Sequence, residues 1–505
     1  MFPDDDNFES FVSLESEKVG IVEEIPFRIL ILGDWSGDGI KKELSSRSPV
    51  EIDRDNFDSV INRLHTKLEL DLSLENDHII SLEFSELSDF HPDNIYRRVP
   101  LFADLRDLRR RLVNPDTFNS AAKDVRNWFI EDSKFESNQE IEKLKTVNSE
   151  DLLDQILSGK SENIKLQVPH NEELSSLLKD LVRPHLLNFD ENEQKALISV
   201  VDEATGNLMR TILHHPKFQN LESAWRSLFF LVRNTETDSL LKIYVLDLTK
   251  HEIINKLKEC NNLTDSEVYR KIVVDANETF GDKPWAAMFG NYTFQPGIDD
   301  IAALIRLSKI ADTLQSPFIS KIADTLLEVE SMYLKPAFSD WNLSEDSITG
   351  KLWSTLRSLP ESKFLGLTIN RFLTRLPFGS KTDEIDSFSF EEFDEHSKHD
   401  SYVWGNSCFI VALLLANSFT KYGWQMGSHF EQEVEKLPIH IYSDGFETIT
   451  KPCAEVNLTQ TACERLLELG LMPLISFRDT DRIRLSRFQS VTKPVSALMG
   501  RWRDS

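Results

Sequence analysis

Between residues 241 and 319 the chain alternates between short apolar runs and longer segments with helical periodicity. Residues 241–248 and 285–292 are apolar runs of strand length, whereas 249–260 and 298–314 repeat apolar side chains every three or four positions. A further strand starts at 316–319. Strands that alternate with helices form a sheet with helices packed on it, because each helix must bury its apolar stripe. The sequence predicts a mixed α/β (α+β) fold, with mixed sheets flanked by helices.

The segment 212–232 predicts a buried helix that follows a turn. The turn is at His215-Pro216, because a residue before proline avoids the helical region. The apolar side chains after it recur at spacings of three and four and form one stripe; they are Phe218, Leu221, Trp225, Leu228 and Val232.

The N-terminal region predicts a strand at 27–32 followed by a glycine-rich loop at 33–39. A phosphate-binding loop is one interpretation of this segment. However, the loop lacks the GxxxxGK[ST] motif, and Asp34 and Asp38 would repel phosphate. A tight turn is the favoured interpretation. Residues 49–57 predict a strand leading into a helix, with Asp53 or Asp55 as N-cap. A hairpin is predicted at 68–84.

An arginine-rich helix is predicted from residue 93 to beyond Leu108. Its exposed arginines are Arg97, Arg98, Arg106, Arg109, Arg110 and Arg111. A nucleic-acid-binding arm is one interpretation. Asp104 and Asp107 lie among the arginines, which favours a salt-bridged helix face or an acidic protein neighbour.

The charge balance excludes two classes of partner. Lys and Arg total 57 against 84 Asp and Glu, a net charge of −27, so nucleic acid and anionic lipid are repelled. No apolar run approaches the roughly 20 residues that span a bilayer. The N-terminus has three successive aspartates and no basic region, unlike a signal peptide. Scattered cysteines without a CxxC pair suggest reduced thiols and a cytoplasmic protein.

Catalytic motifs are missing from the sequence, which contains no GxSxG, HExxH, Walker A or paired CxxC. His214 and His215 precede a proline at a helix start, where a capping histidine is expected rather than a catalytic one. His396, His399 and Asp400 suggest a metal site only weakly, because they lie in an acidic loop. The sequence therefore predicts a non-enzyme without cofactor or metal.

Several motifs resemble the large subunit of the contractile sheath of type VI secretion systems. The strongest is LHHPKFQNLESAWRSL at 213–228, and others are FLGLTINRFLTRLPFG at 364–379, YVWGN at 402–406, and QSV at 489–491 with Lys493-Pro494. A second set, PFRILILGDWSG at 26–37 and VEIDRDNFDSVI at 50–61, resembles the small sheath subunit. The chain thus looks like a fusion of the two subunits.

The resemblance implies three parts: a small-subunit-like domain at 1–113, a polar and partly helical linker at 114–148, and a large-subunit-like domain at 149–505. It also implies a set of signature packing residues. They are Asp34, Asp53, Arg54, Asp55, Phe57, His214, His215, Pro216, Phe218, Leu221, Trp225, Arg371, Phe372, Pro377, Trp404, Gly405 and Asn406.

One short helix carries a further implication. The segment with Leu152, Leu153, Ile156 and Leu157 resembles the LLDxIL segment of large sheath subunits, which the AAA+ sheath-recycling ATPase can capture. A helix this short is marginal alone, so its apolar stripe needs a partner.

The resemblance implies a mechanical protein in the bacterial cytoplasm that packs against itself or other sheath subunits, and against the inner tube and baseplate. Large sheath subunits continue beyond the matching motif at 489–494, so we expect the C-terminal portion that links protomers to be missing. The alternative is a soluble, sheath-derived adaptor that binds sheath, tube or baseplate proteins without polymerising. Acidic stretches at 1–24 and 383–400 and a basic one at 478–503 permit head-to-tail contacts.

Overall fold

The computed structural model describes residues 25–72, 79–125, 193–342, 344–394, 399–444 and 447–503. The predicted helix at 152–157 with Leu152, Leu153, Ile156 and Leu157 lies outside the described residues, as does the acidic stretch 1–24.

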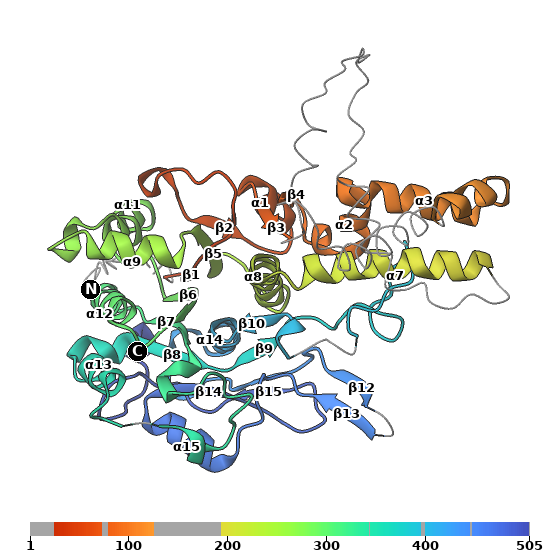
Figure 1. Ribbon diagram of the computed structural model, residues 1–505. Helices are drawn as coiled ribbons and strands as arrows, with labels where there is room; N and C mark the ends of the chain where they lie inside the picture. The colour runs from red at the N-terminus through yellow and green to blue at the C-terminus, as the bar shows by residue number, and fades with distance from the viewer. Residues whose placement is uncertain are drawn as a thin grey trace, which may run out of the picture.

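A nine-stranded mixed sheet forms the centre of the molecule, in the order β11-β15-β14-β8-β7-β6-β1-β5-β2 (Figure 1). The run from β14 to β5 is parallel, while β15 and β2 are antiparallel to their neighbours. The strands of this sheet are β1 (Phe27–Gly33), β2 (Val50–Ile52), β5 (Leu241–Asp247), β6 (Ala287–Phe294), β7 (Phe318–Ile322), β8 (Leu365–Ile369), β11 (Glu433–Val434), β14 (Leu471–Ser476) and β15 (Ile483–Leu485). The mixed α/β prediction is confirmed.

Three two-stranded sheets surround the central one. They pair β3 (Lys67–Asp71) with β4 (Ile79–Glu83), β9 (Arg371–Leu373) with β10 (Trp404–Asn406), and β12 (His440–Asp444) with β13 (Glu447–Lys451). The predicted hairpin at 68–84 corresponds to β3 and β4.

Helices cover both faces of the central sheet. The helices are α1 (Phe57–Arg63), α2 (Pro92–Arg98), α3 (Ala103–Val113), α7 (Glu193–Leu213), α8 (Pro216–Arg233), α9 (Lys250–Lys258), α10 (Glu267–Tyr269), α11 (Asp275–Phe280), α12 (Ile298–Leu314), α13 (Ile348–Arg357), α14 (Cys408–Tyr422) and α15 (Gln460–Glu468). Helices α8 and α14 share a buried core with Ile29 and Ile31 of β1, whereas α9, α12 and α13 share the other core with Leu30 and Leu32. Strand β1 is therefore apolar on both faces, as a central parallel strand must be.

The N-terminal region is interleaved with the rest of the chain. Strand β1 lies between β6 and β5, and β2 pairs with β5 at the edge of the sheet. Both regions therefore contribute to one sheet and its cores, although more than 100 residues separate them in sequence. The boundaries at 113 and 148 stay a prediction about sequence regions. Within the described part of the linker, 114–125, residues 115–125 are helical.

Two helices illustrate how local sequence fixes the ends of an element. Helix α12 spans the predicted 298–314. Helix α15 is capped by Thr459, whose hydroxyl accepts a hydrogen bond from Ala462 N, and Gly470 follows it with φ of +85°. That positive φ strains any residue with a Cβ, so glycine suits the position.

Two local predictions were wrong. The N-cap of α1 is Asn56 rather than Asp53 or Asp55, because Asp53 instead accepts hydrogen bonds from the amides of Asp55 and Asn56 in the preceding turn. The predicted arginine-rich helix is two helices, α2 and α3. Pro100 separates them, because a proline in a helix interior removes a hydrogen bond and clashes with the preceding turn.

Four arginines of α2 and α3 form ion pairs with described residues of the chain, the first being Arg98 with Asp89. Arg109 binds Asp202 of α7 at 2.6 Å, and Arg111 binds Asp124 at 2.5 Å. Arg110 binds Asp107 on its own helix. The salt-bridged helix face is thus observed.

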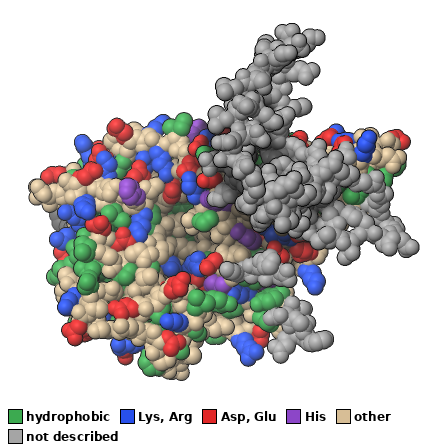
Figure 2. Space-filling view, viewed as in Figure 1, with side chains coloured by type: hydrophobic (Ala, Val, Ile, Leu, Met, Phe, Trp, Pro, Cys, Tyr) green, Lys and Arg blue, Asp and Glu red, His purple; other side chains and the backbone are tan. Residues whose placement is uncertain are grey.

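The surface mixes charges of both signs, as the face in Figure 2 shows. Two residues of the predicted charged stretches are buried: Arg501 donates to the carbonyl of Trp285, and Glu392 lies in an internal ion cluster. The basic and acidic surfaces are therefore smaller than the sequence suggests. Among the described residues, no helix is long and apolar enough to cross a membrane.

Candidate functional site

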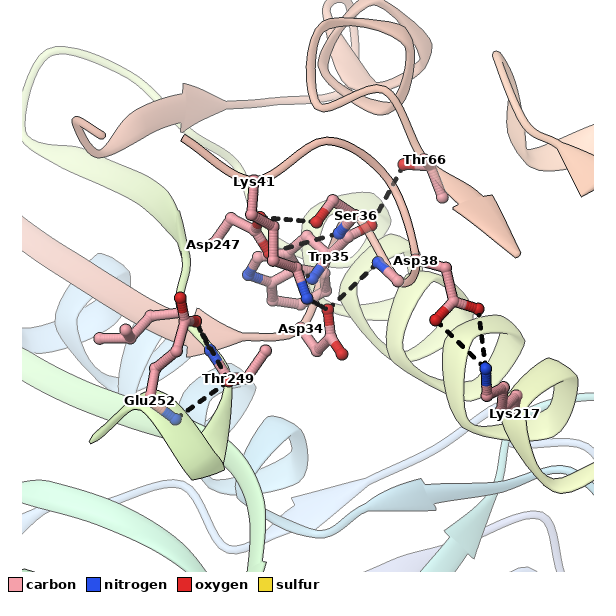
Figure 3. Close-up of polar contacts among 12 residues, drawn as sticks. Asp34, Trp35, Ser36, Asp38, Lys41, Thr66, Lys217, Asp247, Thr249 and Glu252 are labelled. Atoms are coloured by element: carbon pink, nitrogen blue, oxygen red, sulfur yellow. Dashed lines mark hydrogen bonds and ion pairs between the residues drawn. The ribbon is translucent and has the colours of Figure 1, made fainter. Parts of the chain in front are cut away.

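The glycine-rich loop after β1 is fastened to the end of β5. The carboxylate of Asp247 accepts hydrogen bonds from Trp35 N at 2.8 Å and from Ser36 Oγ at 2.7 Å (Figure 3). Asp34 at the loop's start pairs with Lys41 at 2.8 Å and accepts from Gly37 N. The loop is therefore the tight turn that the sequence favours, and it joins the two sequence regions.

Helix α8 packs against this loop through an aromatic cluster. Trp225 is fully buried, its ring lies 5.2 Å from that of Trp35, and its Nε1 donates to the Trp35 carbonyl at 3.1 Å. Phe57 of α1 meets Trp225 edge-on at 5.8 Å. We call Trp35, Phe57, Trp225 and Asp247 the α8 junction.

Both ends of α8 are held by signature residues. His215 is the N-cap, its Nδ1 accepting from Lys217 N, and Pro216 occupies the first turn. Proline fits there because that position has no helical partner for an N–H. At the other end Arg54 donates to the carbonyls of Val232 and Thr235. The capping role predicted for one of the histidine pair thus belongs to His215.

The next turns of α8 contact the N-terminal region as well. Phe218 packs edge-on against Phe90 at 5.8 Å, and Leu221 is buried. Lys217 pairs with Asp38 of the loop at 3.1 Å (Figure 3).

A buried ion cluster lies on the other side of α8. Arg375 binds Glu222 of α8 and Glu392 at 2.7 Å each, and both carboxylates are fully buried. Arg226 adds a second cation at 2.7 Å from Glu222, and His214 lies 3.5 Å from Glu392. Burial alone raises the pKa of Glu392, but Arg375 and His214 outweigh it and lower that pKa to about 2.

Strands β9 and β10 complete the surroundings of α8. Ser223 of α8 donates to the Trp404 carbonyl at 2.7 Å, and Asn406 donates to the Tyr292 carbonyl at 2.8 Å. A Cβ on Gly405 would lie 2.6 Å from Ser227 Oγ, so α8 approaches too closely for a side chain there. Phe372 is fully buried, and the carbonyl of Pro377 accepts from Thr382.

Arg371 belongs to a second polar cluster, beside the β12–β13 hairpin. It binds Glu455 at 2.6 Å and Asp400 at 3.3 Å. Lys451 donates to His399 Nδ1 at 2.7 Å, and its ammonium lies over the ring of Tyr333 at 4.3 Å. His399 is thus engaged by Lys451 and Glu455, while His396 lies outside the described residues.

Sequence reasoning missed several members of these clusters. Glu222 and Arg375 lie inside the matched motifs, so the motifs carried a signal for them. Glu392, Lys451 and Glu455 lie outside every quoted motif, and their partners are distant in sequence.

We expect Lys451 to make stability rise with pH above neutrality. Burial lowers the pKa of Lys451 from 10.5 to about 8, with Glu455 and Asp400 opposing the shift. Between pH 8 and 10.5 the unfolded chain binds more protons at this lysine than the folded chain does. The buried charge therefore lowers the free energy of unfolding by its full amount below pH 8, and by less and less as the pH rises toward 10.5.

The test measures the free energy of unfolding of the wild type and of Lys451→Met in urea, at pH values from 7.5 to 9.5. The difference in unfolding free energy, wild type minus variant, should rise by about 1–2 kcal/mol over this range. A difference that stays flat contradicts the lowered pKa.

The side chains of the α8 junction form hydrogen bonds and aromatic contacts with one another or with neighbouring backbone, and such contacts stabilise packing. Known proteins with similar sequences are structural proteins too. The family model for the VipB (EvpB) tail sheath N-terminal domain matches residues 195–492, and the model for the type VI secretion system protein VipA matches residues 13–129.

A curated protein of similar sequence is also a sheath protein. Type VI secretion system sheath protein TssC1 of Pseudomonas aeruginosa is 33% identical over 309 residues, which are 60% of this chain and 62% of that protein. The chain thus spans less than two thirds of the length of this relative. Since the VipB model covers more than half of the chain, with a VipA match before it, the chain belongs to the VipB family of type VI secretion tail sheath proteins and carries a small-subunit-like region at its N-terminal end.

Proposed function

We propose that the protein is a structural component of, or an assembly factor for, the contractile sheath of a type VI secretion system. The observation that carries the proposal is the position of β1, a strand of the VipA-like region, inside the central sheet, between β6 and β5 of the VipB-like region. A protomer built in this way holds both subunit types at a fixed ratio. Its work is mechanical, through packing states that differ in free energy, and requires no bond chemistry.

The proposed partners follow from this role. Other sheath subunits or further copies of the chain are the first, and the inner tube and baseplate are the next. The segment with Leu152, Leu153, Ile156 and Leu157 is a proposed contact for the AAA+ recycling ATPase. We place the protein in the bacterial cytoplasm, as a non-enzyme.

Negative-stain electron microscopy tests assembly directly. Purified protein, alone and mixed with co-encoded sheath subunits, should form tubes or cap the ends of tubes. Dispersed particles under both conditions, with sheath subunits still captured in a pull-down, identify the non-polymerising adaptor instead. Dispersed particles without any capture contradict both functions.

We draw a separate prediction from the sheet that the two sequence regions share. A protease site inserted between residues 125 and 193 should yield two fragments that stay together after cleavage. Separation would expose both faces of β1, whose Ile29, Leu30, Ile31 and Leu32 are fully buried, and would break its ladders with β5 and β6.

Size-exclusion chromatography of cut and uncut protein gives the measurement. Co-elution in native buffer at the uncut volume is expected, and separation only in denaturant. Two fragments that elute apart in native buffer exclude a shared sheet.

A further inference from the structure

A cleft of about 560 Å³ opens at the carboxyl ends of the parallel strands. Its walls come from the loop after β1 with Asp34 and Asp38, from the start of α9 after β5, and from the ends of β6 and β7. Strand β5 lies on one side of β1 and β6 on the other, so the chain changes direction across the sheet at this point. Crevices at such a switch point are where open α/β sheets bind ligands.

Most charged side chains of the cleft already have a partner of opposite charge. Lys217 pairs with Asp38 at 3.1 Å, and Lys250 pairs with Asp300 at 2.5 Å. Asp34 and Arg371 have the partners described above. These groups balance one another and leave little net charge for a ligand.

Lys321 of β7 differs from the others. Its side chain lines the cleft, the residue is only 6% exposed, and it has no hydrogen bond or ion pair with any described residue. Its Nζ is not fully enclosed by the protein and is open to the cleft. Buried ammonium groups are otherwise paired, because an unpaired one loses its hydration without compensation.

The nearest acidic residue along the chain does not complete the pairing. Asp324 accepts from Met332 N through Oδ2 at 2.9 Å, while Oδ1 is buried without a partner among the described residues. No ion pair within 4.0 Å joins Asp324 to Lys321. Burial lowers the pKa of Lys321 and raises that of Asp324, and it outweighs the opposing attraction between the two charges and that of Glu455 for Lys321.

The walls of the cleft indicate the class of anion. Because the other charges of the cleft are paired, the ammonium of Lys321 balances one negative charge. A carboxylate carries one, whereas a doubly charged phosphate would leave one uncompensated. Leu68, Leu221 and Trp404 supply an apolar surface for the carbon chain that carries it. We propose that this cleft binds a carboxylate group, with Lys321 as its buried counter-ion.

The carboxylate has two possible sources, a small organic acid or a glutamate side chain of a partner protein. The probes are therefore butyrate, the peptide N-acetyl-Gly-Gly-Glu-Gly-Gly-amide, and inorganic phosphate. Binding to the full-length protein is measured by titration calorimetry. Protection is measured by acetylation of lysines with N-hydroxysuccinimidyl acetate and mass spectrometry, with the exposed Lys258 as internal reference.

Butyrate, the peptide or both should bind and slow acetylation of Lys321 but not of Lys258. Lys321→Met, which keeps the length of the side chain, should weaken that binding at least about tenfold, because a charge-assisted hydrogen bond is lost. Lys217→Met, the matched control at the cleft's rim, should change affinity about twofold or less, as expected for an exposed ion pair. Binding of the peptide alone identifies a partner's side chain as the source.

Three results overturn the proposal: phosphate binding alone, no binding by any probe, or equal affinity in Lys321→Met. The variant's melting temperature gives an independent readout. Removing an uncompensated charge should leave the melting temperature unchanged or raise it. A fall shows that Lys321 is already satisfied within the chain, through ordered water to Asp324, and contradicts the proposal.

Discussion

Replacement of Arg375 by methionine is expected to lower the free energy of unfolding by about 3–5 kcal/mol. Arg375 lies between the fully buried carboxylates of Glu222 and Glu392, 2.7 Å from each. Methionine fills similar space but leaves two buried negative charges, with Arg226 beside Glu222 and with His214 and the amide of Phe378 beside Glu392. The cost comes from the uncompensated carboxylates rather than from lost packing.

Two further variants separate these causes. The triple variant Glu222→Leu, Arg375→Met and Glu392→Leu removes both buried carboxylates together with Arg375. It should recover most of the loss, because no buried negative charge remains and the side chain of Arg226, which is 20% exposed, keeps access to water. Arg110→Met removes a solvent-exposed pair with Asp107 and should cost less than about 1 kcal/mol. Urea unfolding followed by circular dichroism measures all three, and an Arg375→Met protein that unfolds at the wild-type urea concentration contradicts the cluster.

Trp225→Ala should cost about 3–5 kcal/mol, through the cavity that a buried indole leaves. Trp225 contacts Trp35 and Phe57 of the N-terminal region, so the cavity opens where the two sequence regions meet. After cleavage between residues 125 and 193, this variant's fragments should separate at a lower urea concentration than wild-type fragments.

Trp225→Phe and Trp353→Ala are the controls. Phenylalanine keeps an aromatic ring but loses the hydrogen bond to the Trp35 carbonyl, at a cost of roughly 1 kcal/mol or slightly more. Trp353 is buried in the core on the other face of the sheet, away from the α8 junction. Its alanine variant should destabilise the protein with a smaller effect on fragment association. Equal effects of Trp225→Ala and Trp353→Ala on association would show that the junction does not hold the regions together.

The sequence was informative wherever structure depends on neighbouring residues. Helix α12 follows from local periodicity, and its predicted bounds hold. The capping of α15 by Thr459 is equally local, because the hydroxyl accepts from an amide three residues further on. The predicted N-cap of α1 was wrong because several neighbouring residues can cap a helix. Asp53, Asp55 and Asn56 all suit a helix start, and the turn that Asp53 stabilises left the N-cap to Asn56.

The motifs also led to most of the residues around α8, though not to what these residues do. His215 is the exception, because its capping of α8 is a local role that the sequence predicts. Arg54 and Gly405 were singled out as signature positions, but their roles as partner of terminal carbonyls and point of close approach depend on elements roughly 180 residues away. Glu392 and Lys451 carried no motif at all, because their surroundings are assembled from distant segments.

The sequence by itself determined the mixed α/β class, the stripe of α8 and the membership of a sheath family, since periodicity and motif spacing are local properties of the chain. Only the tertiary structure decided that β1 lies between β6 and β5, that Arg375 neutralises two buried glutamates, and that Lys321 faces a cleft unpaired. Strand order and charge pairing depend on which distant segments meet, and contacts across more than 100 residues leave no periodic trace in the sequence.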